Sequence, residues 1–100
     1  MGTLLLMTKA FFKDTLIAQS DWYIEVEGNV YFPPEALNRE YLKNNEKTTH
    51  CGWKGTANYY DVVVNGTTAN AAAWYYPEPL EEALKIKDHV AFGAEIQVEP

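Results

Sequence analysis

The fold is decided by residues 50–76, HCGWKGTANYYDVVVNGTTANAAAWYY, a stretch typical of two β-strands joined by a tight turn. Asn65-Gly66 favours a two-residue β-turn, because both central positions of that turn need positive φ. We therefore predict a long antiparallel hairpin with arms at 57–64 and 68–76. The ends of the hairpin bring four aromatic side chains towards one another: Trp53, Tyr59, Trp74 and Tyr76.

The size and cysteine content set the broad class of protein. One hundred residues suit a single domain, residues 1–100, with its own hydrophobic core. The only cysteine, Cys51, has no internal disulfide partner, which favours a reducing, cytoplasmic setting. The opening residues lack the basic start and the length of a signal peptide or membrane span. We interpret residues 1–8 as an N-terminal extension.

The charge distribution argues against two kinds of partner. The formal net charge is −6, and the acidic residues are spread along the chain rather than gathered in a tail. Nucleic acids and anionic membranes bind proteins through basic surfaces. We therefore expect a soluble protein that binds neither nucleic acid nor membrane.

Alternation of apolar and polar residues predicts more strands before the hairpin. In WYIEVE, residues 22–27, Trp22, Ile24 and Val26 face one way and the residues between them face the other. Gly28-Asn29 then favours a turn, so this segment begins a first hairpin. Together these signals predict strands at 15–19, 22–27 and 30–32.

The remaining segments indicate short connections and a final pair of strands. Pro33-Pro34 ends the preceding strand, because proline removes a backbone donor and restricts its predecessor. Pro79 suits the first turn of a helix in which Leu80, Ala83 and Leu84 share a face. We predict helical turns at 35–43, a polar connection at 44–49, and a strand pair at 89–92 and 95–98 turning at Gly93. The fold class is therefore mainly β, with short helical connections.

Three strings, THCGWKGTANYYDV, NAAAWYYPEP and IKDHVAF, resemble a small bacterial family catalogued as domain of unknown function 427. The likeness covers nearly the whole chain from Lys9 onwards and includes the stretch EGNVYFP. Family members usually carry proline where this chain has Gly52, so we expect a more flexible loop after Cys51. The resemblance rests on an ordered set of residues: Cys51, Lys54-Gly55, Tyr59-Tyr60, Asn70, Trp74, Tyr76, Pro79 and 90–92.

The resemblance implies a β-tent, in which two small antiparallel sheets lean together over a pocket. Methionine sulfoxide reductases of the B type and the thalidomide-binding domain of cereblon share this architecture. Many of those relatives hold a structural zinc with paired CxxC motifs, whereas this chain has one cysteine. We therefore expect no metal and no cofactor. The family is sometimes labelled nucleotidyltransferase-like, but the chain has neither a paired-aspartate metal motif nor a Walker loop.

Cys51 is the candidate for covalent chemistry. Positive charge from His50 and Lys54 would favour its thiolate. Adjacent residues of an extended segment point to opposite faces, however, and the chain lacks a resolving cysteine. A free cysteine also serves as a small buried hydrophobe. Both interpretations remain open at this point.

The other candidates concern binding. Lys54 between glycines resembles an anion-binding loop without its full motif. Tyr60 and Trp74 fit a pocket wall and a core equally well, and Asn70 needs a partner if it is buried. We expect a small molecule to bind in an aromatic-lined pocket between two sheets. The expected lining is Cys51, Trp53, Lys54, Tyr60, Asn70, Trp74 and Tyr76.

Two alternatives belong to other functional classes. The first is an enzyme that uses Cys51 as nucleophile or redox centre, with His50 or Tyr60 assisting. The second is a protein-interaction module that presents its exposed aromatic residues to a partner.

Overall fold

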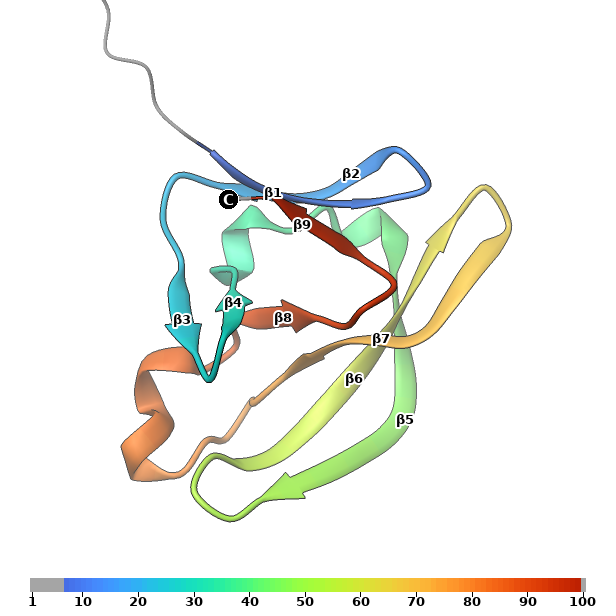
Figure 1. Cartoon of the computed structure of the whole chain (residues 1–100). Coiled ribbons are helices and arrows are strands. Elements are labelled where there is room, and N and C mark those ends of the chain that lie inside the picture. Colours follow the sequence, from blue (N-terminus) through green and yellow to red (C-terminus); the bar gives the residue numbers. More distant parts are fainter. Residues whose placement is uncertain (1–6, 100) are drawn as a thin grey trace, which may run out of the picture.

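The computed structural model describes residues 7–99, which form three antiparallel sheets (Figure 1). The first sheet has the strand order β2-β1-β9, the second is the hairpin β3-β4, and the third has the order β5-β6-β7-β8. The strands of the first two sheets are β1 (Thr8–Phe12), β2 (Thr15–Ser20), β9 (Gln97–Glu99), β3 (Ile24–Val26) and β4 (Asn29–Tyr31). Those of the third are β5 (Leu42–Cys51), β6 (Gly55–Val64), β7 (Thr67–Tyr75) and β8 (Val90–Phe92).

The mainly β fold and its central hairpin are confirmed. Strands β6 and β7 pair antiparallel, with Val64 opposite Thr67 next to the turn. Asn65 and Gly66 have φ values of 48° and 79°, the positive values that a tight two-residue turn requires. Both turn residues are exposed, so this hairpin tip projects into solvent.

The polar connection predicted at 44–49 is wrong, because these residues lie inside β5. Strand β5 is the edge of its sheet and pairs only with β6 among the described strands. Most of its side chains are exposed, so no apolar alternation marks it in the sequence. Charged side chains such as Lys43 and Lys47 also protect an exposed edge from pairing with other chains.

The N-terminal extension predicted at 1–8 is too long by at least one residue, since β1 begins at Thr8. Strand β1 is the central strand of the first sheet and pairs with both β2 and β9. Strand β2 follows β1 after a two-residue turn, whereas β9 comes from the opposite end of the chain, so the local sequence could not indicate that second pairing. The expectation for residues 1–6 lies outside the described residues. With this sheet, the fold has three sheets rather than the expected two.

The predicted final strand pair is also wrong, because β8 and β9 do not pair with each other. Strand β8 pairs with β7, whereas β9 crosses to the first sheet and pairs with β1. Between them, the backbone N–H of Gly93 donates to the carbonyl of Ala72 at 2.8 Å. The segment after β8 is thereby held on the third sheet before the chain leaves it.

The predicted helical segments form three short 3₁₀ helices: η1 (Pro34–Ala36), η2 (Arg39–Tyr41) and η3 (Glu81–Ile86). In η3, Ala83 and Ile86 are the buried residues, and their spacing of three matches the period of a 3₁₀ helix. Leu84, which we expected on the buried face, is 56% exposed. Within residues 7–99, no helix is long and apolar enough to cross a bilayer.

Strand β3 is shorter than predicted, because it begins at Ile24 rather than Trp22. The Ser20 hydroxyl donates to the carbonyl of Trp22 at 2.5 Å and accepts from the backbone N–H of Trp22 at 3.1 Å, so a local turn precedes the strand. Trp22 is 48% exposed and lies edge-on to His89. The predicted alternation holds for the residues that follow, since Ile24 and Val26 contribute to a buried cluster.

Two hydrophobic clusters lie among the sheets. The larger one joins the first and third sheets through residues such as Phe12, Ile17, Phe32, Val62 and Phe92. The smaller one joins the β3-β4 hairpin to the third sheet and η3 through Val26, Tyr31, Ala57, Tyr76, Ala83, Ile86 and Ala91. The β3-β4 hairpin therefore packs on the third sheet at one end of the molecule (Figure 1).

Candidate functional site

Two of the expected site residues, Trp53 and Tyr76, lie around a third, the buried Lys54. Lys54 is only 8% exposed, and its ammonium donates to the carboxylate of Glu27 at the tip of the β3-β4 hairpin. Its Nζ atom lies 5.3 Å from the ring centroid of Trp53 and 5.7 Å from that of Tyr76. Two cation–π contacts and one ion pair thus already satisfy the charge of Lys54. We call these four residues the lysine cluster.

Within the lysine cluster, Lys54 and Glu27 each favour the charged form of the other. The hydrogen bond from Lys54 is the main reason that the pKa of Glu27 lies below its ordinary value. Burial by itself lowers the pKa of Lys54, but the hydrogen bond to Glu27 and the charges of Tyr31, Tyr76 and Cys51 outweigh it, so the pKa is raised. Burial raises the pKa of Tyr76. Cys51 is thus one of the residues whose charge acts on Lys54.

Trp74 joins a neighbouring aromatic group. Its indole N–H donates to the hydroxyl of Tyr31 at 3.1 Å, and this hydrogen bond connects β7 of the third sheet to β4 of the second. Its ring lies 6.3 Å from that of Tyr59, the residue opposite it in the register of β6 and β7. This contact fulfils the expected convergence of the two arms at Tyr59 and Trp74.

Tyr60 and Asn70 lie apart from this group. The Tyr60 ring stacks on that of Tyr75 at 4.7 Å, and its hydroxyl accepts a hydrogen bond from Arg39 at 3.5 Å. Asn70 is exposed, and its side-chain oxygen accepts from the amide of Asn45 at 3.3 Å. None of these contacts of Tyr60 and Asn70 involves a residue of the lysine cluster.

A bulge interrupts the pairing of the two arms beside Asn70. The register of β6 and β7 shifts between Tyr60 and Val62. Ala71 has a φ of 49° there, and its N–H donates to the carboxylate of Asp61 at 2.7 Å. Between the pairs Val62–Ala69 and Tyr60–Ala73, β7 has two residues more than β6, and these interrupt the alternation of side chains around Asn70. Tyr60 is separated from Trp74 by ordinary alternation instead, because its neighbour Tyr59 is the residue opposite Trp74. The sequence offered no glycine at the bulge to mark it.

Three of the cavities on the surface of residues 7–99 each include one candidate residue from the sequence. The largest takes in Trp74, the smallest takes in Trp53, and the third takes in His50. None of the three is lined by Cys51, Lys54 or Tyr76. Of the lysine cluster, only Trp53 borders one of these cavities, and none of its four residues lines the largest one.

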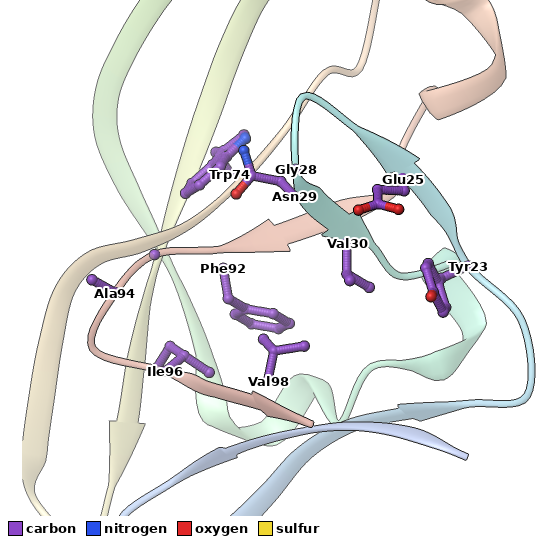
Figure 2. Close-up of a pocket in the computed structure, with 11 residues that line it drawn as sticks. Tyr23, Glu25, Gly28, Asn29, Val30, Trp74, Phe92, Ala94, Ile96 and Val98 are labelled. Atoms are coloured by element: carbon purple, nitrogen blue, oxygen red, sulfur yellow. The ribbon is translucent and has the colours of Figure 1, made fainter. Parts of the chain in front are cut away.

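The largest cavity has a volume of about 590 Å³ and lies where the three sheets meet (Figure 2). Its apolar surface comes from β4, β8, β9 and the segment between the last two: Val30, Phe92, Ala94, Ile96 and Val98. Phe92 and Ile96 are buried, and the Phe92 ring lies edge-on to Phe32 at 5.6 Å. Polar groups enter from the β3-β4 hairpin: Tyr23, Glu25 and Asn29. We call this space the junction cavity.

The alternation in WYIEVE positions the polar wall of the junction cavity. Glu25 lies opposite Val30 in the register of β3 and β4, so both side chains project from one face of the hairpin. Tyr23 lies two residues before Glu25 and lines the same cavity. The other face, with Ile24 and Val26, packs into the smaller hydrophobic cluster.

Sequence reasoning missed most of the junction cavity, since Trp74 alone was among its expected residues. The parity of WYIEVE did indicate that Tyr23 and Glu25 share a face. The residues of the opposite wall could not be predicted in this way, because Ile96 and Val98 reach the cavity only through the pairing of β9 with β1. That pairing joins segments almost the whole chain apart.

The charges at the β3-β4 hairpin differ between its two glutamates. Glu27 is paired with Lys54, and this is the one ion pair within residues 7–99. Glu25 has no charged partner among the residues that the structure describes, and its carboxylate lies at the rim of the cavity (Figure 2). No lysine, arginine or histidine is found among the lining residues. The junction cavity therefore presents one unpaired negative charge.

A family model described as Domain of unknown function (DUF427) matches residues 7–99, which is nearly the whole chain. No curated protein matches this sequence.

Proposed function

The chain belongs to the DUF427 family, and we propose that it binds a small molecule in the junction cavity. The observation that carries this proposal is the cavity itself, with its volume of about 590 Å³ and its wall of Val30, Phe92, Ile96 and Val98. Binding sites for small molecules typically measure about 300–1,000 Å³ and combine a mostly apolar wall with a few polar groups. Tyr23, Glu25 and Asn29 are the polar groups here.

The lysine cluster supports this proposal indirectly. Lys54 holds Glu27, and with it the tip of the β3-β4 hairpin, against the loop between β5 and β6. The neighbouring residues Gly28 and Asn29 form part of the cavity wall. In this view Trp53, Lys54 and Tyr76 position one wall of the site rather than contact the ligand.

Cys51 has no place in the proposed site, because it lines none of the three cavities. This favours binding over chemistry at the thiol. The lone cysteine fits a protein of the reducing cytoplasm, and we include that location in the proposal.

The test is a screen of a metabolite library by ligand-detected NMR, followed by two matched variants. Ala94→Trp places a large ring at an exposed position of the cavity wall, so it fills the cavity without disturbing the core. Gln97→Trp adds the same ring to the exposed side of β9, where Gln97 does not line the cavity. We expect binding to the wild type and Gln97→Trp, and loss of at least about tenfold in affinity with Ala94→Trp.

Two results would contradict this function. One is a screen in which no compound binds the wild-type protein. The other is a set of compounds whose affinity for Ala94→Trp equals that for the wild type. Circular dichroism of both variants establishes that any loss of binding reflects the cavity and not the fold.

A further inference from the structure

Resting on the binding function proposed above, we infer that the junction cavity selects organic cations, with an apolar body and an ammonium group directed at Glu25. Three features of the lining favour such a ligand: the sign of its charge, its balance of hydrogen-bond donors and acceptors, and the separation of its apolar and polar parts.

The sign of the charge is set by Glu25. It is the only charged residue of the lining, and no basic side chain of residues 7–99 forms an ion pair with it. A ligand with a carboxylate would meet a like charge at close range, which disfavours binding. A ligand with an ammonium group supplies the opposite charge that the lining lacks.

The two glutamates of the hairpin, Glu25 and Glu27, differ in whether they have an ion-pair partner. They lie two residues apart, yet Lys54 neutralises Glu27 from the β5-β6 loop. Lys54 cannot serve both carboxylates, because it is buried between the rings of Trp53 and Tyr76. Glu27 is thus paired with the buried ammonium of Lys54, whereas Glu25 faces the cavity without an ion-pair partner among residues 7–99.

The hydrogen-bonding groups point to a ligand that donates. Trp74 would be a natural donor, but its indole N–H is already bonded to the hydroxyl of Tyr31. The aromatic ring of Trp74 instead faces Gly93, since a Cβ at Gly93 would lie 3.8 Å from Cζ3 of Trp74. The carboxylate of Glu25 accepts only, while the Asn29 amide and the Tyr23 hydroxyl can both donate and accept. An ammonium group, with three donors and no acceptor, complements this set.

The apolar and polar parts of the lining are separated in space. Val30, Phe92 and Val98 lie near one another at the centre of the cavity, whereas Glu25 and Tyr23 lie to one side (Figure 2). Phe92 is held in place by its edge-on contact with Phe32. A ligand that fits both parts has a ring or branched chain at one end and the charge at the other.

The test compares three probes that share a phenyl ring: 2-phenylethylamine, 2-phenylethanol and 3-phenylpropionate. Dissociation constants are measured by chemical-shift titration of the wild-type protein at low ionic strength. We expect the amine to bind about threefold to fivefold more tightly than the alcohol, as an exposed ion pair allows. The carboxylate should bind most weakly. Added salt should reduce the preference for the amine, since exposed charges are screened.

Two variants identify the carboxylate responsible. Glu25→Gln should bind the amine and the alcohol equally, because the amide keeps the size of the side chain and removes its charge. Glu95→Gln is the matched control, since Glu95 is exposed in the segment between β8 and β9 and does not line the cavity. It should retain the preference of the wild type. The salt titration of the wild type tests the same charge without any substitution.

The outcomes separate this inference from the function on which it rests. Equal binding of amine and alcohol by the wild type, with both lost in Ala94→Trp, overturns the cation preference and leaves the binding function intact. A preference for the amine that survives in Glu25→Gln also overturns the assignment to Glu25. If the carboxylate binds as tightly as the amine, the inference fails. If none of the probes binds, it fails as well, and the metabolite screen alone decides the binding function.

Discussion

The ammonium of Lys54 donates to the carboxylate of Glu27, and this ion pair connects the β5-β6 loop to the tip of the β3-β4 hairpin. Glu27 has a φ of 54° and Gly28 a φ of 80°, so the carboxylate projects from the turn itself. The hairpin has only three paired residues on each strand, and short hairpins are marginally stable alone. Its position beside the junction cavity therefore depends on contacts such as this one.

Removing either partner of the ion pair should destabilise the protein, but to different degrees. Lys54→Met keeps the hydrocarbon volume and loses the cation–π contacts, at a cost of roughly 1 kcal/mol in the free energy of unfolding. Glu27→Gln should cost more, because it leaves a buried ammonium without its counter-ion. Glu25→Gln, on the same hairpin and without an ion-pair partner within residues 7–99, is the control and should change stability little. Urea denaturation measures all three, and equal effects of the two glutamate variants would contradict the structural role of Glu27.

The same ion pair should make stability depend on pH in the acid range. The pKa of Glu27 in the folded protein is below its ordinary value of 4.5. Glu27 therefore contributes stability above pH 4.5, and this contribution is lost as the pH falls through its lowered pKa. The free energies of unfolding of wild type and Glu27→Gln should converge as the pH is lowered. A difference that stays constant from neutral pH to below the folded pKa would contradict this assignment.

Replacing Ala71 at the bulge with glycine should not destabilise the protein. Ala71 has a φ of 49°, a conformation that costs a residue with a Cβ roughly 1–2 kcal/mol. Glycine removes that cost and adds about 0.5–1 kcal/mol of backbone entropy in the unfolded state, so Ala71→Gly should be neutral or more stable by up to about 1 kcal/mol. Ala72→Gly is the control, since the buried Ala72 lacks a positive φ and should lose stability. Thermal denaturation compares the two variants, and a larger loss for Ala71→Gly would refute the account.

The contribution of the Trp74–Tyr31 hydrogen bond to the free energy of unfolding can be measured with the variant Tyr31→Phe. Tyr31 is fully buried, so this change leaves the Trp74 indole N–H without its partner and should cost about 1–2 kcal/mol. Tyr59→Phe removes a hydroxyl that contacts the Thr49 hydroxyl at an exposed site, and it should cost less than about 0.5 kcal/mol. Chemical denaturation followed by tryptophan fluorescence reports both values. Equal costs would show that the buried hydrogen bond contributes nothing beyond an exposed one.

Cys51→Ser should leave ligand binding unchanged. Cys51 lines none of the three cavities, and the charged residue that it influences is Lys54, which also lines none of them. The titrations used for the Ala94→Trp variant should give the same dissociation constants for Cys51→Ser and wild type. A loss of binding in Cys51→Ser would instead favour the alternative in which the thiol takes part in chemistry.

The sequence alone determined the elements whose information is local. Asn65-Gly66 supplies positive φ at two successive positions, so the turn between β6 and β7 follows from the dipeptide itself. The alternation of Ile24, Glu25 and Val26 similarly determined which side chains of β3 are buried and which face away. The single cysteine and the dispersed acidic charge also follow directly from composition.

Tertiary structure alone decided the partners of the segments that lack such signals. Strand β5 is polar because it is an edge, and β1 joins β9 across nearly the whole chain, so neither pairing leaves a periodic pattern in the local sequence. The bulge at Ala71 interrupts the alternation of β7 beside Asn70, and no glycine in the sequence marks its position. The junction cavity has the same origin, because its walls come from β3, β4, β7, β8 and β9. Hydrophobic burial depends on which surfaces meet, and that is set by the whole chain rather than by neighbours in sequence.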